Sequence, residues 1–344
     1  MWHESRVEQG TVMLLDFFLP VTLKLYDKKG FFMAETSRVD MKKSWELLTA
    51  AIFRSTASGQ GTTDAAIRGL AFHRYVSAGT PMPRFLKPVI IVVAQGRKLV
   101  RIGKNEYNYG ENICFVTGVN MPVASCVLEA SEEKPYLAMS LYLDTELLSA
   151  LAVKTPSSSG YANDISCGAM IQEMEPDLVD AFLRLAELSN KYDDIPVMGD
   201  ILLREIHYRL LRSPIGNLLR TFNTLGSQGN QVAKAINWLQ KNYKTPLRIE
   251  ELAERSNMAP STFHKYFKSV TTLSPLQYQK RLRLDEAQRL MMSGQCDVTQ
   301  AAFSVGYESV TQFIREYKRL FGDSPRRNIV NLKNTNILSE IQIL

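Results

Sequence analysis

Two short segments of this chain carry the same chemistry at the same spacing. Residues 263–268 read FHKYFK and residues 313–318 read FIREYK. In each, a phenylalanine and a second aromatic residue stand four positions apart, so on a helix they share one face and belong to a core. The residues between them include a basic side chain at the third position and fall on the opposite face. The pattern predicts two helices, 50 residues apart, each with a buried aromatic face and an exposed polar and basic face.

The residues before each copy predict a second, shorter helix and a tight turn. Ala253 and Ala302 stand four positions before Asn257 and Gly306, which are residue types that tolerate a positive φ. A small side chain at that point lets two helices cross closely, and Asp297 is a suitable N-cap for the second short helix. The sequence therefore predicts two helix-turn-helix units in series.

The exposed face of each second helix carries groups that can read DNA. Arg315 can bond guanine with two donors, and Gln312 can bond adenine in the same way. Lys268, Lys318 and Arg319 lie one turn further along, where phosphate contacts are expected. The alternative for any single one of these residues is a solvated surface side chain. The predicted base-facing residues are Ser261, Thr262, His264 and Lys265 in the first unit and Thr311, Gln312 and Arg315 in the second.

The segment between the two units predicts one continuous helix over 275–294. Its apolar residues Tyr278, Leu282, Ala287 and Leu290 follow helical spacing. A rigid helix would fix the distance between the two readers. Dimeric repressors reach two major grooves about 34 Å apart by symmetry. Here a single chain would reach two adjacent grooves of double-stranded DNA by duplication.

The charge distribution agrees with a polyanionic partner for the C-terminal part. The net charge is +6, but residues 227–344 hold 17 Lys and Arg against 10 Asp and Glu, and the first 226 hold 24 against 25. The excess of positive charge therefore lies where the repeated segments are.

The last hundred residues resemble the DNA-binding domain of AraC/XylS-family transcriptional regulators. The resemblance implies a regulator that contacts RNA polymerase and that activates more often than it represses. One departure is that Pro325 is followed by RRNIV in place of the usual Pro-x-x-Tyr-Arg. The residues that carry the resemblance are Leu252, Ala253, Phe263, Phe267, Lys268, Pro275, Tyr278, Arg283, Leu284, Ala287, Leu290, Ala302, Gly306, Tyr307, Phe313, Arg315, Tyr317, Lys318, Phe321, Gly322, Ser324 and Pro325.

The first half of the chain reads as short strands followed by helices. Between residues 72 and 144, β-branched runs alternate with Gly, Asn and Pro, which is typical of a small antiparallel barrel or sandwich. Residues 67–151 resemble the cupin-like N-terminal domain of one AraC-type subgroup, which implies a site for a small-molecule effector. The expected fold is α+β: a small cupin-like antiparallel β-barrel with flanking helices, then an all-α domain of two helix-turn-helix units joined by a long helix.

A search for catalytic or metal-binding residues finds no constellation in this first half. Of the four histidines only His73 lies near the predicted barrel, and the four cysteines lack a C-x-x-C spacing. No enzyme activity, metal or cofactor is therefore predicted. Cys114 and Cys126 are the candidates for effector binding, as thiols that an electrophile or oxidant could modify. The alternative is that both are buried small hydrophobic residues.

The residue patterns and the resemblance together predict five segments and leave two possible functions. The segments are an extension (1–40), the sensor domain (41–152), a helical coupling or dimerisation segment (153–226), the DNA-binding domain (227–328) and a tail (329–344). The helical segment either pairs with a second copy in a homodimer or packs on its own barrel. The expected protein is a bacterial, cytoplasmic DNA-binding regulator controlled by an effector, with no membrane partner. The rival reading is a barrel enzyme or small-molecule carrier whose basic domain binds nucleic acid without specificity.

Overall fold

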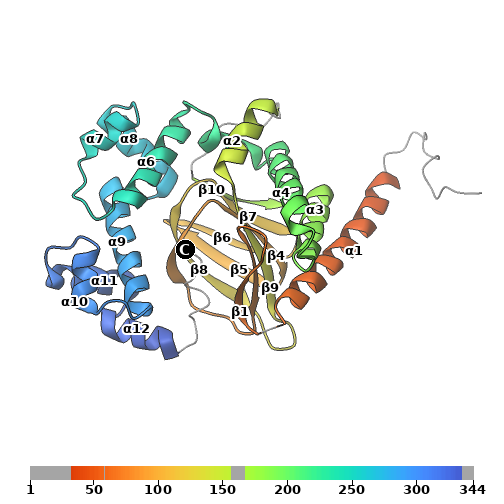
Figure 1. The fold of residues 1–344 in the computed structure, drawn as a ribbon, viewed down its shortest axis with the longest axis horizontal. Helices are drawn as coiled ribbons and strands as arrows, with labels where there is room; N and C mark the ends of the chain where they lie inside the picture. The colour runs from red at the N-terminus through yellow and green to blue at the C-terminus, as the bar shows by residue number, and fades with distance from the viewer. Residues whose placement is uncertain (1–31, 58, 156–166, 335–344) are drawn as a thin grey trace, which may run out of the picture.

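Two antiparallel β-sheets face each other in the N-terminal half of the chain, and helices build the remainder (Figure 1). The computed structural model describes residues 32–57, 59–155 and 167–334. The six-stranded sheet has the order β1-β2-β9-β4-β7-β10, and the four-stranded sheet has the order β3-β8-β5-β6. The strands are β1 (Gly61–Asp64), β2 (Leu70–Tyr75), β3 (Met82–Leu86), β4 (Val89–Gln95), β5 (Arg97–Ile102), β6 (Asn105–Gly110), β7 (Ile113–Thr117), β8 (Met121–Glu129), β9 (Tyr136–Tyr142) and β10 (Ala169–Glu173).

The register of the strands decides which side chains point between the sheets. Phe115 of β7 lies opposite Ile91 of β4, and Ile91 lies opposite Ser140 of β9. Tyr109 of β6 stacks on Phe115 with ring centroids 5.5 Å apart, so both rings lie in the space between the sheets. Because side chains alternate along a strand, the neighbouring positions face outward.

Helices cover the outer face of the six-stranded sheet. The indole of Trp45 in α1 donates a hydrogen bond to the carbonyl of Ala94 at 3.1 Å, and the Arg74 guanidinium lies over the ring of Phe53. Helices α3 and α4 pack on each other, and α3 packs on α1, which places these three helices along one side of the barrel (Figure 1). The N-terminal helices are α1 (Phe32–Ser55), α2 (Thr145–Lys154), α3 (Pro176–Leu188), α4 (Ile195–Arg212) and α5 (Gly216–Asn223).

The C-terminal domain is helical throughout its described residues, which end at residue 334. Its core residues include Phe263, Phe267, Phe313 and Tyr317, all with no exposed surface, as the aromatic spacing predicted. The helices are α6 (Gln228–Asn242), α7 (Ile249–Arg255), α8 (Pro260–Thr271), α9 (Pro275–Met292), α10 (Val298–Ser304), α11 (Val310–Phe321) and α12 (Pro325–Asn334).

The predicted fold class is confirmed, with three differences in detail. The strand β10 was not predicted, because its five residues follow a loop and gain strand geometry only by pairing with β7. Helix α1 begins at Phe32, inside the range assigned to the extension, and α12 runs into the range assigned to the tail. The rest of the extension (1–31) and of the tail (335–344) lie outside the described residues. Among the helices described, none is long and apolar enough to cross a membrane.

Candidate nucleic-acid interface

The first helix-turn-helix unit consists of α7 and α8. Asn257 takes a φ of 49° in the turn between them, as its residue type predicted. Pro260 opens α8 at a position where its missing N–H costs nothing, since that N–H would have no partner inside the helix. Leu252 and Ala253 of α7 are buried against the aromatic residues of α8. The unit is thus held by its inner face, and the other face of α8 is left outside.

The second unit, α10 and α11, repeats this construction with better caps. The Asp297 side chain accepts a hydrogen bond from the Gln300 amide at 2.8 Å, and the Gln300 side chain accepts one from the Asp297 amide at 3.1 Å. The predicted N-cap is therefore part of a complete capping box. Gly306 has a φ of 89°, and a Cβ there would lie 2.3 Å from the carbonyl oxygen of Lys244. The turn requires glycine on both grounds.

The predicted DNA contacts lie together on the outer faces of α8 and α11. Of the ten predicted contact residues, His264 is half-buried and the other nine are exposed. A shift of 50 residues superposes four positions of each set, so Lys265 corresponds to Arg315 and Thr262 to Gln312. The side chains of one helix present hydroxyls, an imidazole and ammonium groups, and those of the other a hydroxyl, an amide, an ammonium group and guanidinium groups. The exposed predicted residues are Ser261, Thr262, Lys265, Lys268, Thr311, Gln312, Arg315, Lys318 and Arg319.

A buried carboxylate under the second reader was not predicted. Glu316 of α11 is 7% exposed and accepts hydrogen bonds from Lys280 Nζ (2.8 Å), Tyr307 Oη (2.8 Å) and Gln312 Nε2 (3.3 Å). Burial alone would raise the pKa of Glu316, but these three donors bring it below its ordinary value. The carboxylate joins α11 to α9 and restrains Gln312. A charged residue at the buried position between Phe313 and Tyr317 was the signal that sequence reasoning passed over.

The long helix α9 fixes the two units relative to each other. It has 18 residues and is therefore about 27 Å long. Arg283 near its middle donates hydrogen bonds to the carbonyl oxygens of Tyr243 (2.7 Å) and Lys244 (3.0 Å), and to that of Gly306 (2.8 Å). The first two acceptors precede the first unit, and the third lies in the turn of the second unit. The guanidinium thus joins the segment before the first unit and the turn of the second unit to one helix, a role that the sequence did not reveal.

The C-terminal domain rests on the edge of the barrel. Tyr278 of α9 donates a hydrogen bond to the carbonyl oxygen of Asn120 at 3.0 Å and meets the ring of Phe85 of β3 edge-on. The Asn120 side chain in turn donates to Gln240 of α6 at 2.8 Å. Gly168 donates its amide to the carbonyl oxygen of Val270 in α8. These contacts use the back of the first unit and leave its outer face open.

The space between the two sheets carries polar groups that could bind an effector. His73 is 6% exposed, and its ring nitrogens lie 2.8 Å from Ser140 Oγ and 3.0 Å from Thr62 Oγ1. Burial, followed by the nearby charges of Lys98 and Arg84, lowers the pKa of His73 to about 3, so the ring is neutral. The Tyr109 hydroxyl is fully buried and has no hydrogen-bond partner in the part of the chain that the structure describes. Within the described residues no group of three or more His, Cys, Asp or Glu could hold a metal ion.

The two candidate cysteines, Cys114 and Cys126, lie on different sheets. Cys114 neighbours Phe115 on β7 and therefore faces away from the space between the sheets. It donates to the carbonyl oxygen of Gln172 at 3.4 Å, and burial raises the pKa of its thiol to about 12. Cys126 is 7% exposed and lies opposite Leu99 of β5. The burial of Cys114 therefore disfavours the thiolate form that modification of this residue would require.

Comparisons with known proteins agree with both halves of this architecture. Residues 66–218 match the family model of the AraC-type transcriptional regulator N-terminus, and residues 252–328 match that of a helix-turn-helix domain. The chain belongs to the AraC/XylS family of transcriptional regulators. The shared segment of this AraC-family chain is 30% identical over 101 residues to the HTH-type transcriptional activator RhaS of Pectobacterium carotovorum, and 35% identical over 91 residues to RhaS of Escherichia fergusonii.

These curated relatives cover only part of the AraC-family chain. The match to the Pectobacterium protein spans 29% of this chain and 36% of that one. The structure of ToxT from Vibrio cholerae strain SCE256, solved with an unsaturated fatty acid bound, aligns over 79% of this chain and 95% of its own. The TM-score is 0.51 at 12% identity, so this likeness shows a common fold.

Proposed function

We propose that this protein is a sequence-specific DNA-binding transcription factor that reads two adjacent major grooves. The observation that carries the proposal is the duplicated outer face of α8 and α11, held at a fixed separation by α9. Arg315 and Gln312 would contact bases in the second groove, and Lys265 with its neighbours would contact bases in the first. Lys268, Lys318 and Arg319 would contact phosphates.

We further propose that a small molecule bound in the N-terminal barrel controls this activity. The buried polar groups around His73 and the unpartnered Tyr109 hydroxyl provide hydrogen-bonding positions between the sheets. ToxT, which has the same fold, was solved with an unsaturated fatty acid bound. The effector would favour one arrangement of the sensor and DNA-binding domains over another. Because the RhaS relatives are named activators, activation through contact with RNA polymerase is the expected output, in the bacterial cytoplasm and without catalysis.

The direct test is a binding selection from random duplex DNA with the full chain at about physiological salt. Two conserved blocks about one helical turn apart are expected. Arg315→Ala should relax one block and Lys265→Ala the other, each at a cost of about 1–3 kcal/mol. Lys241→Ala is the matched control, because Lys241 is exposed on α6 and lies on neither reader. A motif that survives both reader substitutions unchanged would contradict the assignment of these residues.

Salt dependence separates this proposal from non-specific binding, the rival reading that the comparisons do not favour. A loose basic domain would bind every duplex with similar affinity and lose that affinity steeply with salt through counterion release. A specific reader keeps a preference for the selected motif over scrambled DNA at each salt concentration. Equal affinity for both duplexes across the titration would favour the rival.

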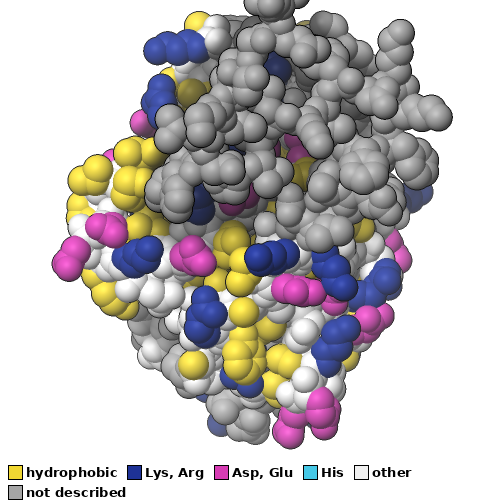
Figure 2. All heavy atoms as spheres, turned by 90° about the vertical axis from the view of Figure 1, so that its right-hand side faces the viewer, with side chains coloured by type: hydrophobic (Ala, Val, Ile, Leu, Met, Phe, Trp, Pro, Cys, Tyr) yellow, Lys and Arg dark blue, Asp and Glu magenta, His cyan; other side chains and the backbone are white. Residues whose placement is uncertain are grey.

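A homodimer is the proposed state of the protein in solution, with α4 as the contact. Val197, Ile201 and Tyr208 form one exposed stripe on this helix, with exposed fractions of 66%, 53% and 46%. Figure 2 views the molecule from the side on which α1, α3 and α4 lie, where hydrophobic side chains are interspersed with charged ones. Two antiparallel copies of α4 would set Val197 of one copy against Tyr208 of the other and bring Asp200 close to Arg204. The stripe is thus self-complementary, as a two-fold interface requires.

Sedimentation of the full chain tests the dimer. Ile201→Glu should give a monomer, because it places a charge in the centre of the stripe. Val330→Glu is the control, since Val330 is a similarly exposed apolar residue on α12. A wild-type chain that sediments as a monomer would refute the proposal.

A further inference from the structure

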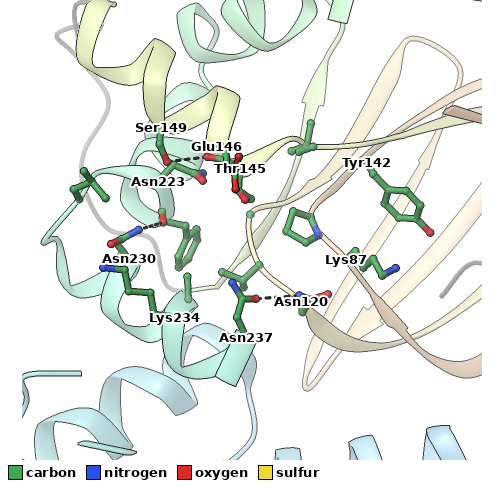
Figure 3. A pocket seen from close by; sticks show the side chains of 17 residues that line it. Lys87, Asn120, Tyr142, Thr145, Glu146, Ser149, Asn223, Asn230, Lys234 and Asn237 are labelled. Atoms are coloured by element: carbon green, nitrogen blue, oxygen red, sulfur yellow. Dashed lines mark hydrogen bonds between the residues drawn. The ribbon is translucent and has the colours of Figure 1, made fainter. Parts of the chain in front are cut away.

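A cleft lies where the sensor, the coupling helices and the DNA-binding domain meet. Its volume is about 570 Å³, enough for a small metabolite. Its walls come from the ends of β-strands around Pro88 and Val119, from the start of α2, from α5 and from α6 (Figure 3). The cleft is distinct from the space between the sheets, because Lys87 and Asn120, which line it, lie in turns outside the barrel interior. Any molecule in this cleft would touch the sensor and the first helix of the DNA-binding domain at once.

The charged groups of the cleft favour an anion. Lys87 lies on the barrel side and Lys234 on the α6 side, with Glu146 of α2 as the acidic residue of the lining. The ammonium group of Lys87 lies 5.5 Å from the centre of the Tyr142 ring and forms no ion pair with a described residue. Lys234 is exposed and likewise forms no ion pair within the described part of the chain. Two ammonium groups against one carboxylate leave one positive charge for a ligand to neutralise.

The uncharged lining favours hydroxyl groups on the same ligand. Four asparagines line the cleft: Asn120, Asn223, Asn230 and Asn237 (Figure 3). The side-chain amides of Asn120 and Asn230 both use their N–H groups within the protein, whereas the oxygen of each is buried and accepts no hydrogen bond from any described residue. Each of these two side chains is only 8% exposed. Buried acceptors without donors are costly, and a ligand hydroxyl would supply the missing donor once the side-chain amide turns its oxygen toward the cleft.

We propose that this cleft is a second small-molecule site, which binds a hydroxylated carboxylate of about the size of a sugar acid. The carboxylate would pair with Lys234, and the hydroxyl groups would bond the asparagine amides and the Thr145 and Ser149 side chains. Phe222, Leu225 and Val119 provide the apolar part of the lining against which the carbon skeleton would lie.

Ligand binding here would act directly on the contact between the domains. The Asn120 amide joins the barrel to α6 through its bond to Gln240, while its oxygen is closed to solvent. The amide can offer that oxygen to a ligand only by turning, and a turn withdraws its NH2 group from Gln240. Occupation of the cleft would therefore loosen α6 from the barrel. This consequence for DNA rests on the proposed function, whereas binding itself does not.

The experiment measures binding to the full chain by calorimetry with four probes. D-Gluconate and D-glucuronate carry the proposed chemistry, D-glucose lacks the carboxylate, and hexanoate lacks the hydroxyls. The sugar acids are expected to bind, and both comparison compounds to bind more weakly. Lys234→Gln should weaken the sugar acids about ten-fold, the effect of one lost charge-assisted hydrogen bond. Lys241→Gln removes the same charge from an exposed position of the same helix outside the cleft and should bind as the wild type does.

Each outcome decides the proposal separately from the proposed function. Absence of binding by both sugar acids at about millimolar concentration overturns it, as does equal binding by wild type and Lys234→Gln. Equal binding of hexanoate and gluconate would overturn the part played by the asparagines. Because DNA selection needs no added ligand, a protein that selects a two-block motif yet binds neither sugar acid keeps the proposed function and loses this site.

Discussion

The two helix-turn-helix units are built alike but are joined to the rest of the molecule in different ways. The first unit belongs to the same continuous hydrophobic core as the barrel, through Phe263, Phe267 and Tyr278. The second unit forms a separate core with α12 and the C-terminal half of α9. This core touches the barrel through Met82 of β3. A change in the sensor would thus act first on the first reader.

The C-cap residues of α8 and α11 show the same difference. Thr272, directly after α8, has a φ of 64°, and Gly322, directly after α11, has a φ of 83°. Glycine adopts this conformation without cost, whereas a β-branched residue is strained there. Thr272 lies against Gly103 of the barrel, where an added Cβ would be 2.8 Å from the threonine side chain. The strained residue is therefore the one in contact with the sensor.

The two units also differ in their buried polar contacts, and here the second unit is the more firmly held. The second unit holds the buried carboxylate of Glu316, bonded by Lys280 and Tyr307. The corresponding position of the first unit is Tyr266, whose side chain is partly exposed. The second unit is thus fixed to α9 by charge, whereas the first is fixed to the barrel by apolar packing and uncharged hydrogen bonds. We infer that the second unit acts as the constant reader and the first as the regulated one.

The largest effect is expected for Arg283→Ala, because Arg283 bonds both the segment before the first unit and the turn of the second unit. Its guanidinium donates to carbonyl oxygens next to the first unit and in the turn of the second. Loss of these charge-assisted bonds should lower the free energy of unfolding by about 3 kcal/mol. Urea unfolding of the full chain measures it. Arg289→Ala, which removes a pair with Glu286 within α9, should cost less than about 1 kcal/mol. Equal losses of unfolding free energy for the two variants would show that Arg283 does not connect the units.

Glu316→Gln is expected to weaken the second unit only, by about 2 kcal/mol, since the bond from Lys280 loses its charge partner. The pKa of Glu316 is below its ordinary value of 4.5 in the folded protein. Its stabilising effect is therefore complete above that value and is lost as the pH falls through the lower folded pKa. The protection factors of the α11 amides against hydrogen exchange should fall in acid more than those of α8, and the variant should reduce this contrast. A parallel fall in both helices of the wild type would contradict the comparison.

Residue patterns predicted the local features of both units and missed the long-range ones. Asp297 as N-cap, Asn257 and Gly306 as turn residues and the four core aromatic residues follow from rules that act within one or two helical turns. The bonds of Arg283 and the bond from Lys280 to Glu316 depend on which helices cross, and they join positions 23 to 40 residues apart. The strand β10 likewise exists through its pairing with β7. The roles of the DNA-facing residues remain predictions.

A smaller effect is expected from Thr272→Gly. The substitution removes the strain of a left-handed threonine and should raise the free energy of unfolding by up to about 1 kcal/mol. At the same time it deletes the contact with Gly103, so the first unit should be held less firmly to the barrel. Thermal unfolding measures the first effect, and limited proteolysis of the domain junction the second. The reverse change, Gly322→Thr, should destabilise the second unit without any effect on the junction. A Thr272→Gly variant that is less stable than the wild type would show that the barrel contact outweighs the strain.

The smallest predicted effect distinguishes the two readers by chemistry. The residue that corresponds to His264 in the second unit is Ile314, an apolar side chain that is 38% exposed in the middle of the outer face of α11. An exposed apolar group at that place suits the C5-methyl group of thymine. Replacing one thymine of the second block by uracil removes only that methyl, which should weaken binding by about 0.8 kcal/mol, or roughly four-fold. The Ile314→Ser variant should bind the thymine and uracil duplexes equally. Base changes in the first block should weaken binding of the wild type and of this variant to the same extent. If uracil has the same small effect on the wild type and on Ile314→Ser, then Ile314 does not read the methyl group, and the readers differ in attachment rather than in what they recognise.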